Sequence, residues 1–173
     1  KLNKVNSLKG EAEVQDSNKV LVHSDEGDIR EVFGDKIIIA TGSRPIDLAG
    51  FNVDQELIAN STGALNFKEV PENLGVIGAG AIGLELGSVW SRLGSNVVVL
   101  EALEEFLPMA DTQIASEAKK IFESQGLEIL LGSNVGSAII NSNKINLSYS
   151  GAMGQKSIIL DKLIIAVGRK PLS

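Results

Sequence analysis

The chain has 173 residues, of which 43% are hydrophobic, a formal net charge of −6 and no cysteine. This length supports one complete globular domain with additional chain on either side. The acidic balance without a Lys/Arg run argues against nucleic acid or an anionic membrane as a partner, and no apolar run approaches the roughly 20 residues that span a bilayer. The lack of cysteine excludes disulfides and thiol chemistry within the chain. We therefore expect a cytoplasmic protein, and the start at Lys1 without Met indicates a piece of a longer one.

The first part of the chain predicts short β-strands. Residues 19–24 and 28–33 have the pattern of two strands joined by an acidic turn that contains glycine. The run Lys-Ile-Ile-Ile-Ala at 36–40 predicts a further strand that is buried on both faces, as parallel strands usually are. Residues 43–60 are expected to form a connection, because proline and glycine interrupt them.

From residue 62 onward, helical and strand patterns alternate. The predicted elements are a short helix at 62–67, a strand at 74–77, a helix from about 80 to 93, a strand at 96–100, a helix from Asp111 to Gly126, a strand at 127–131, three short strands within 135–160 and a parallel strand at 162–167. This order predicts an α/β fold, with a Rossmann-like parallel sheet, flanking helices and a small antiparallel three-stranded meander.

The two longer helices have predicted ends and inward faces. Gly94 is expected to end the first helix, and Asp111 to cap the start of the second. The residues expected to face inward are Ile82, Leu86, Val89, Trp90 and Leu93 in the first helix, and Ile114, Ala118, Ile121 and Phe122 in the second.

A glycine-rich turn between the strand at 74–77 and the following helix carries the chemistry. Gly78 allows the tight turn, Gly80 lets a phosphate approach the backbone, and Gly83 lets the helix pack closely on the sheet. The helix N-terminus offers free N–H groups to a pyrophosphate. This pattern predicts a dinucleotide site. The alternative is that the glycines only build a tight turn.

Glu101 ends the next strand, 23 residues after Gly78, near the spacing at which an acidic residue binds ribose hydroxyls. Such a carboxylate favours NAD, because the 2′-phosphate of NADP would meet a like charge and no arginine stands beside it. If the glycines are only structural, Glu101 is a solvated strand end.

Two near-copies of one segment flank the glycine turn. Residues 35–45 read Asp-Lys-Ile-Ile-Ile-Ala-Thr-Gly-Ser-Arg-Pro, and residues 161–171 read Asp-Lys-Leu-Ile-Ile-Ala-Val-Gly-Arg-Lys-Pro, so seven of eleven positions are identical. This arrangement predicts a dinucleotide-binding unit inserted into a larger host fold, with matching strands where the chain leaves and re-enters the host.

These motifs together resemble the flavin-dependent pyridine nucleotide-disulfide oxidoreductases, and within them the dihydrolipoamide dehydrogenases. The resemblance covers essentially the whole chain. It rests on Ala-Thr-Gly-Ser-Arg-Pro at 40–45, Asn-Ser-Thr-Gly-Ala-Leu at 60–65, the stretch at 75–90 that contains the glycine turn, and Ala-Val-Gly-Arg-Lys-Pro at 166–171.

The resemblance implies two sets of cofactor-binding residues. The residues that it assigns to NAD are Gly78, Ala79, Gly80, Ala81, Ile82, Gly83, Leu84, Glu85, Glu101, Val135 and Gly168. Those that it assigns to FAD are Ala12, Thr41, Gly42 and Ser43.

The resemblance also implies a division of the chain. Residues 1–47 would be the β-rich C-terminal tail of an FAD-binding domain, 48–168 the NAD-binding domain and 169–173 the return to the FAD-binding domain. The family's redox cysteine pair, its first FAD fingerprint and its His-Glu acid–base pair have no counterpart here. The implied catalytic set of this piece is therefore empty, no metal is implied, and the piece alone is expected to be inactive.

The implied parent enzyme passes electrons from dihydrolipoyl groups through a disulfide and FAD to NAD. Its implied partners are the rest of the same flavoenzyme, the lipoyl domains of a 2-oxo acid dehydrogenase complex and a second copy in a homodimer. The alternatives are a related NADH-dependent flavoprotein, such as an NADH oxidase or a transhydrogenase, and a stand-alone NAD-binding module without redox turnover.

Four other polar residues have competing interpretations. Glu85 matches a family acid near the flavin and nicotinamide, or is an exposed carboxylate on a helix. His23 is expected to be a surface strand residue, since no acidic partner stands at motif spacing. Arg44 and Arg169 are expected to form ion pairs where domains meet.

Overall fold

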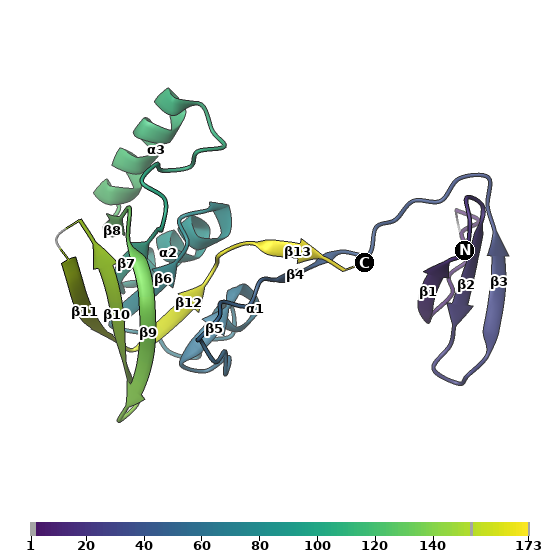
Figure 1. The fold of residues 1–173 in the computed structure, drawn as a ribbon, viewed down its shortest axis with the longest axis horizontal. Helices are drawn as coiled ribbons and strands as arrows, with labels where there is room; N and C mark the ends of the chain where they lie inside the picture. The colour runs from purple at the N-terminus through teal and green to yellow at the C-terminus, as the bar shows by residue number, and fades with distance from the viewer. Residues whose placement is uncertain (1–2, 153, 173) are drawn as a thin grey trace. The chain divides into compact units, whose positions relative to one another are not determined.

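The computed structural model describes residues 3–152 and 154–172. The chain divides into two compact units, Lys1–Gly42 and Ser43–Ser173 (Figure 1). Each unit has its own hydrogen-bonded sheet structure. Among the described residues, no helix has both the length and the apolar character needed to cross a membrane.

The first unit is a three-stranded antiparallel sheet with the order β1-β2-β3. The strands are β1 (Glu11–Val14), β2 (Lys19–His23) and β3 (Ile29–Phe33). The two strands expected at 19–24 and 28–33 are confirmed as the β2–β3 pair. Strand β1 was not expected from the sequence, because two of its four residues are glutamates and its apolar signal is weak.

The expected strand at 36–40 is wrong. The structure has no strand there, and Ile38 and Ile39 are 88% and 68% exposed. An apolar run becomes a doubly buried strand only when other strands pair with its edges and other layers cover its faces. Within the described residues, no strand pairs with this segment.

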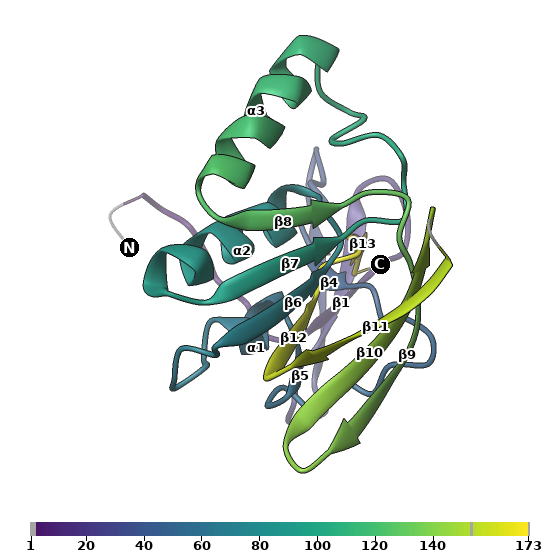
Figure 2. The same cartoon turned by 90° about the vertical axis from the view of Figure 1, so that its left-hand side faces the viewer.

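The second unit is built on a five-stranded parallel sheet with the order β5-β12-β6-β7-β8 (Figure 2). The strands are β5 (Ile58–Asn60), β6 (Asn73–Ile77), β7 (Asn96–Leu100), β8 (Leu127–Leu130) and β12 (Lys162–Ile165). The predicted Rossmann-like sheet is therefore confirmed. The expected connection at 43–60 contains two short strands, β4 (Ser43–Pro45) and β5, which three-residue patterns do not reveal.

Helices cover one face of this sheet. Asp111 caps α3 as predicted, accepting hydrogen bonds from the backbone N–H groups of Gln113 and Ile114 at 2.9 and 3.3 Å. Gly94 ends α2 in the left-handed conformation with φ of 113°. The helices are α1 (Ser61–Ala64), shorter than the predicted 62–67, α2 (Ala81–Leu93) and α3 (Thr112–Ser124).

The three-stranded antiparallel meander covers the other face and is confirmed. Its order is β11-β10-β9, and residues Ser142 and Asn143 form the first turn with φ of 48° and 59°. Positive φ at both central residues is the geometry of a tight hairpin, which asparagine tolerates well. The strands are β9 (Asn134–Asn141), β10 (Lys144–Gly151) and β11 (Gly154–Leu160).

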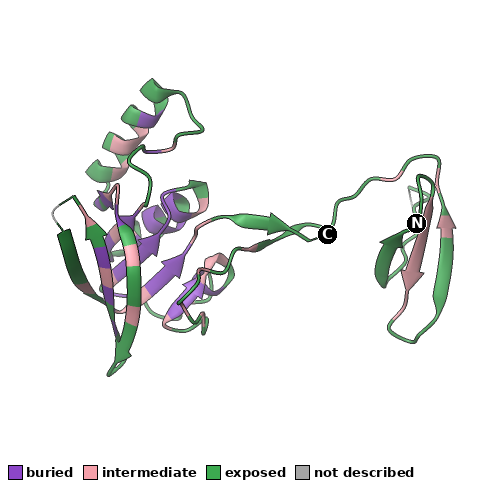
Figure 3. Ribbon diagram, viewed as in Figure 1, coloured by how far each residue is buried: buried purple, intermediate pink, exposed green. Residues whose placement is uncertain are grey.

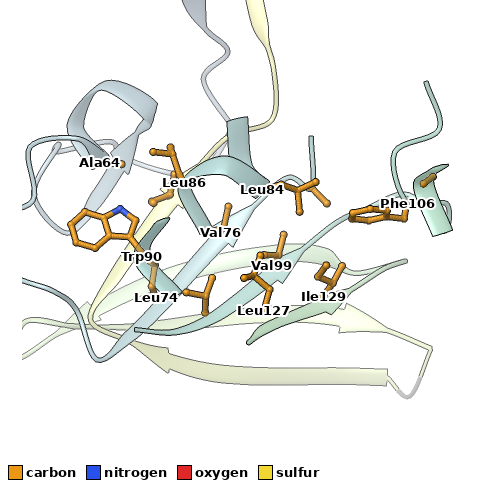
Figure 4. Close-up of a cluster of buried hydrophobic side chains, with 14 residues drawn as sticks. Ala64, Leu74, Val76, Leu84, Leu86, Trp90, Val99, Phe106, Leu127 and Ile129 are labelled. Carbon is orange, nitrogen blue, oxygen red and sulfur yellow. The ribbon is translucent and has the colours of Figure 1, made fainter. Parts of the chain in front are cut away.

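Alternation along the central strands produces two cores, one on each face of the sheet. Val76 and Ile164 pack with Leu84 and Trp90 on the helical face (Figure 4). Leu163 packs with the meander on the opposite face. The buried residues lie mainly in the parallel sheet and in the elements that pack against its two faces (Figure 3).

The predicted inward faces of the two helices are partly wrong. Leu86 and Trp90 are buried as expected, and Ala118 and Phe122 are half-buried against the core. In α2 the buried face includes Gly83, Leu84, Gly87 and Ser88, so it is displaced around the helix from the face that the apolar pattern predicted, and α3 buries Ala115. The residues that were expected inside but are exposed are Val89, Leu93, Ile114 and Ile121.

Asp161 joins the meander to the parallel sheet. Its side chain forms an ion pair with Lys144, and its Oδ2 atom accepts a hydrogen bond from the Asn73 backbone N–H at 2.9 Å. The contact with Lys144, followed by the Asn73 hydrogen bond, lowers the pKa of Asp161 below its ordinary value of 3.8.

We expect Asp161→Asn to lower stability at pH 7 by about 1 kcal/mol, since the Lys144 partner is about half exposed and water screens the pair. Because the folded-state pKa is lowered, the stabilisation exists above the unfolded-state pKa of about 3.9 and disappears as the pH falls through the folded-state value. Thermal unfolding at pH 7 and at lower pH measures this. Equal stabilities of the two proteins at pH 7 would contradict it.

Candidate functional site

A cavity of about 690 Å³ opens at the carboxyl ends of β6, β7 and β12. Most of its walls come from the ends of these strands, from the segments that follow them and from the start of the meander, and Leu48 contributes from the connection between β4 and β5. The lining residues are Leu48, Ile77, Gly78, Gly80, Ala81, Ile82, Leu100, Glu101, Ala102, Leu103, Ser133, Asn134, Val135, Ala166, Val167, Gly168 and Arg169.

The strand order explains the position of the cavity. From β6 the chain crosses through α2 to β7 on one side, whereas β12 returns on the other side of β6. The connections diverge at this strand, and a parallel sheet has its crevice outside the carboxyl ends of strands at such a switch point.

Two glycines of the turn after β6 lie where the surrounding backbone leaves no room for a side chain. Gly78 has φ of 103°, and an added Cβ would lie 2.5 Å from the Ala166 carbonyl oxygen. A Cβ on Gly83 would lie 2.0 Å from the Gly78 carbonyl oxygen. Both positions therefore require glycine for close packing, independent of any ligand.

Gly80 differs from these two glycines. It is the N-cap of α2, its φ is −76°, and no atom lies within 4 Å of the position of an added Cβ. No side chain caps the helix there. The N–H groups of the first turn and the positive end of the helix dipole are thus available to an anion at the cavity wall.

Glu101 stands directly after β7, and backbone groups fix its carboxylate. Its Oε2 accepts a hydrogen bond from the Ala79 N–H at 2.8 Å, and its Oε1 accepts one from the Leu103 N–H at 3.0 Å. Each carboxylate oxygen can accept more than one hydrogen bond, so both retain capacity for a ligand hydroxyl. The Glu101 carboxylate, which lines the cavity, is therefore held in one orientation by the backbone around it.

The cavity gathers seven of the eleven residues expected at the NAD site, namely Gly78, Gly80, Ala81, Ile82, Glu101, Val135 and Gly168. The other four do not line it. Ala79 donates its backbone N–H to the Glu101 carboxylate. Gly83 packs against the Gly78 carbonyl group, and Leu84 is buried in the helical core. Glu85 is exposed on α2.

The residues expected at an FAD site are not collected in this cavity. Ala12 lies in β1 of the first unit, and Thr41 and Gly42 end that unit, whereas Ser43 begins β4. All four are exposed. They do not line the described cavity, and no step through a flavin follows from their placement.

The isolated charged residues have local partners. His23 Nε2 lies 3.4 Å from Glu13 Oε2 on the neighbouring strand, a cross-strand contact that is consistent with a surface strand residue. Arg44 forms an ion pair with Asp47 at 3.4 Å, a local contact three residues along the chain that does not test the expected placement where domains meet. Arg169 instead donates hydrogen bonds to Ser43.

Sequence reasoning missed part of the cavity wall. Its polar members are Ser133 and Asn134 at the start of β9, and its apolar members include Leu48, Leu103 and Val167. Val167 could have been predicted together with Gly168, because both follow a parallel strand beside β6 and so lie at the same sheet edge. No sequence motif marks Leu48 or Asn134.

The strand order, the glycine turn and the acid after β7 define a doubly wound fold of the Rossmann type. The chain matches the family described as pyridine nucleotide-disulphide oxidoreductase over residues 2–173, so it belongs to that family. The resemblance that the motifs indicated is thereby confirmed. A relative from Cupriavidus necator, named dihydrolipoyl dehydrogenase, is 46% identical over 98% of this chain and 36% of its own length.

Solved structures agree with this assignment. The HOCl-induced flavoprotein disulfide reductase RclA from Escherichia coli has a TM-score of 0.73 and 33% identity, over 95% of this chain and 36% of its own. LpdA from Mycobacterium tuberculosis has a TM-score of 0.78 at 21% identity, over 94% of this chain and 36% of its own, and supports the fold. The chain thus spans little more than a third of the proteins that it matches.

Proposed function

We propose that this chain is the NAD-binding portion of a flavin-dependent dihydrolipoamide dehydrogenase. The proposed parent enzyme oxidises dihydrolipoyl groups through a disulfide and FAD and reduces NAD to NADH. The observation that carries the NAD part is the Glu101 carboxylate, held by two backbone N–H groups at the rim of the cavity that Gly80 and the uncapped start of α2 also form. The relatives named dihydrolipoyl dehydrogenase support the choice of substrate.

The residues of this chain would bind and orient the dinucleotide. The first-turn N–H groups of α2 would donate hydrogen bonds to the pyrophosphate oxygens, and the missing Cβ at Gly80 would let the pyrophosphate approach. Glu101 would accept hydrogen bonds from the ribose hydroxyls. Val135 and Gly168, at the start of β9 and after β12, would form the side walls. When bound, NAD supplies the acceptor for two electrons and a proton.

The proposal extends to parts that this chain does not contain. We propose that Ala12, Thr41, Gly42 and Ser43 contact FAD together with the remainder of a longer protein, and that residues 1–47, 48–168 and 169–173 are the domain segments defined above. We also propose cytoplasmic location, homodimerisation of the full-length protein and association with lipoyl domains, as the resemblance implies.

Glu101→Ala tests the proposed role of the carboxylate. We expect NADH affinity to fall roughly tenfold or more, because hydrogen bonds to a charged group are lost, and the preference over NADPH to disappear. Isothermal titration calorimetry measures both. Glu104→Ala is the matched control, since Glu104 is a nearby exposed carboxylate that does not line the cavity. Unchanged NADH affinity in Glu101→Ala would refute the assignment.

Electron donors separate the proposed enzyme from its alternatives. A full-length protein that contains this chain should reduce NAD with dihydrolipoamide. An NADH oxidase or a transhydrogenase would fail with this donor but use NADH with oxygen or with a second nucleotide. A stand-alone module would bind NADH without turnover.

A further inference from the structure

The last three residues of the two near-copies, 43–45 and 169–171, pair with each other in the structure. Strand β4 pairs antiparallel with β13 (Arg169–Pro171), and the pairing joins Ser43 to Pro171, Arg44 to Lys170 and Pro45 to Arg169 (Figure 1). Arg44 and Lys170 occupy equivalent positions in the two copies, so the ribbon has an approximate local twofold relation.

At one position of the ribbon the two copies carry a serine and an arginine, and these two residues form a polar contact. Ser43 and Arg169 occupy the position after the shared glycine in the two copies, and they contact each other. The Arg169 Nε donates to the Ser43 Oγ at 2.8 Å, and its Nη2 donates to the Ser43 carbonyl oxygen. Arg169 takes part in no ion pair with another described residue.

The same arginine belongs to the cavity wall. Val167, Gly168 and Arg169 line the cavity in sequence, and the Gly168 carbonyl oxygen accepts a hydrogen bond from the Ile46 N–H at 3.0 Å. Gly168 has φ of 123°, so the wall turns sharply here before it enters β13. This wall is therefore held to the β4 segment by hydrogen bonds to Ser43 and Ile46.

We propose that the Arg169–Ser43 contact is a clamp that positions the Val167–Gly168 wall for the dinucleotide, which makes Arg169 a positioning residue. This inference rests on the proposed NAD-binding function. The planar guanidinium presents donors in a fixed fork that reaches a side-chain and a main-chain oxygen of one residue, and the single ammonium of lysine does not reproduce this geometry.

The experiment compares Arg169→Met and Arg169→Lys with the unmodified 173-residue chain. NADH affinity is measured by calorimetry, and amide hydrogen exchange is followed at Ile46. Loss of the clamp should weaken NADH binding about threefold to tenfold in both variants, the effect of losing a typical hydrogen bond. Exchange at Ile46 should accelerate in both. Arg44→Met is the control, since it removes the same charge from the same ribbon outside the cavity lining.

The outcomes separate the clamp from the proposed function. Wild-type exchange at Ile46 in Arg169→Met would overturn the clamp, whatever the affinity. Full recovery of NADH affinity in Arg169→Lys would also overturn it, because charge would then suffice. If the unmodified chain binds no NADH, the proposed function fails and with it the positioning role, even where faster exchange shows that the contact itself holds the ribbon.

Discussion

Gly83→Ala should destabilise the second unit by about 3 kcal/mol or more, at the upper end of what overpacking costs. The added Cβ would lie 2.0 Å from the Gly78 carbonyl oxygen, a backbone atom of the tight turn. Removing this overlap would require α2 to move away from β6. That movement would separate Leu84 of α2 from Val76 of β6, which both belong to the helical core. Thermal unfolding should show a midpoint roughly 10 °C lower, given the size of the chain.

Gly87→Ala is the matched control for this prediction. Gly87 is also buried in α2, but an added Cβ would meet the Leu127 side chain at 3.4 Å, which is an ordinary contact. Since alanine is the better helix former, this variant should be neutral or more stable by up to about 1 kcal/mol. Equal stability of Gly83→Ala and Gly87→Ala would contradict the close packing of helix and turn.

Gly80→Ser should separate binding from stability. Serine at this N-cap position can accept a hydrogen bond from the first turn, so the stability should stay the same or rise by a few tenths to about 1 kcal/mol. The side chain would enter the open space beside the helix start, where the phosphates are proposed to approach. NADH affinity should therefore fall roughly tenfold or more, a loss of about 1.4 kcal/mol.

Calorimetry and thermal unfolding on the same sample check both parts of the Gly80→Ser prediction. Unaltered NADH affinity in a stably folded variant would show that the ligand does not use this space. A strongly destabilised variant would instead contradict the geometry of the turn, because no atom lies within 4 Å of the added Cβ position.

The spacing of apolar residues predicted the elements of the second unit because those residues are buried in the cores of the same unit. The β-branched run at 96–100 and the asparagine turn at 141–143 carry their information locally. The failure at 36–40 has the opposite cause, since an apolar run specifies a buried strand only when partners cover it. The same dependence on partners left Ile114 and Ile121 exposed where the periodicity placed them inside.

The candidate site was predictable where a motif fixes the backbone. The glycines of the turn and Glu101 are marked by type and spacing, and the structure brings Gly78, Gly80 and Glu101 to one cavity. The hydrogen bond from the Leu103 N–H to Glu101 is local, but the one from the Ala79 N–H spans 22 residues of sequence, and no local pattern encodes it. The Ser43–Arg169 contact depends on pairing across 126 residues of sequence.

A calorimetric titration of the 173-residue chain with NADH and NADPH decides whether this cavity binds NAD. We expect saturable NADH binding that is at least about tenfold tighter than NADPH binding, since Glu101 opposes a 2′-phosphate. A folded chain that binds neither nucleotide, or binds both equally, would contradict the assignment of this cavity to NAD.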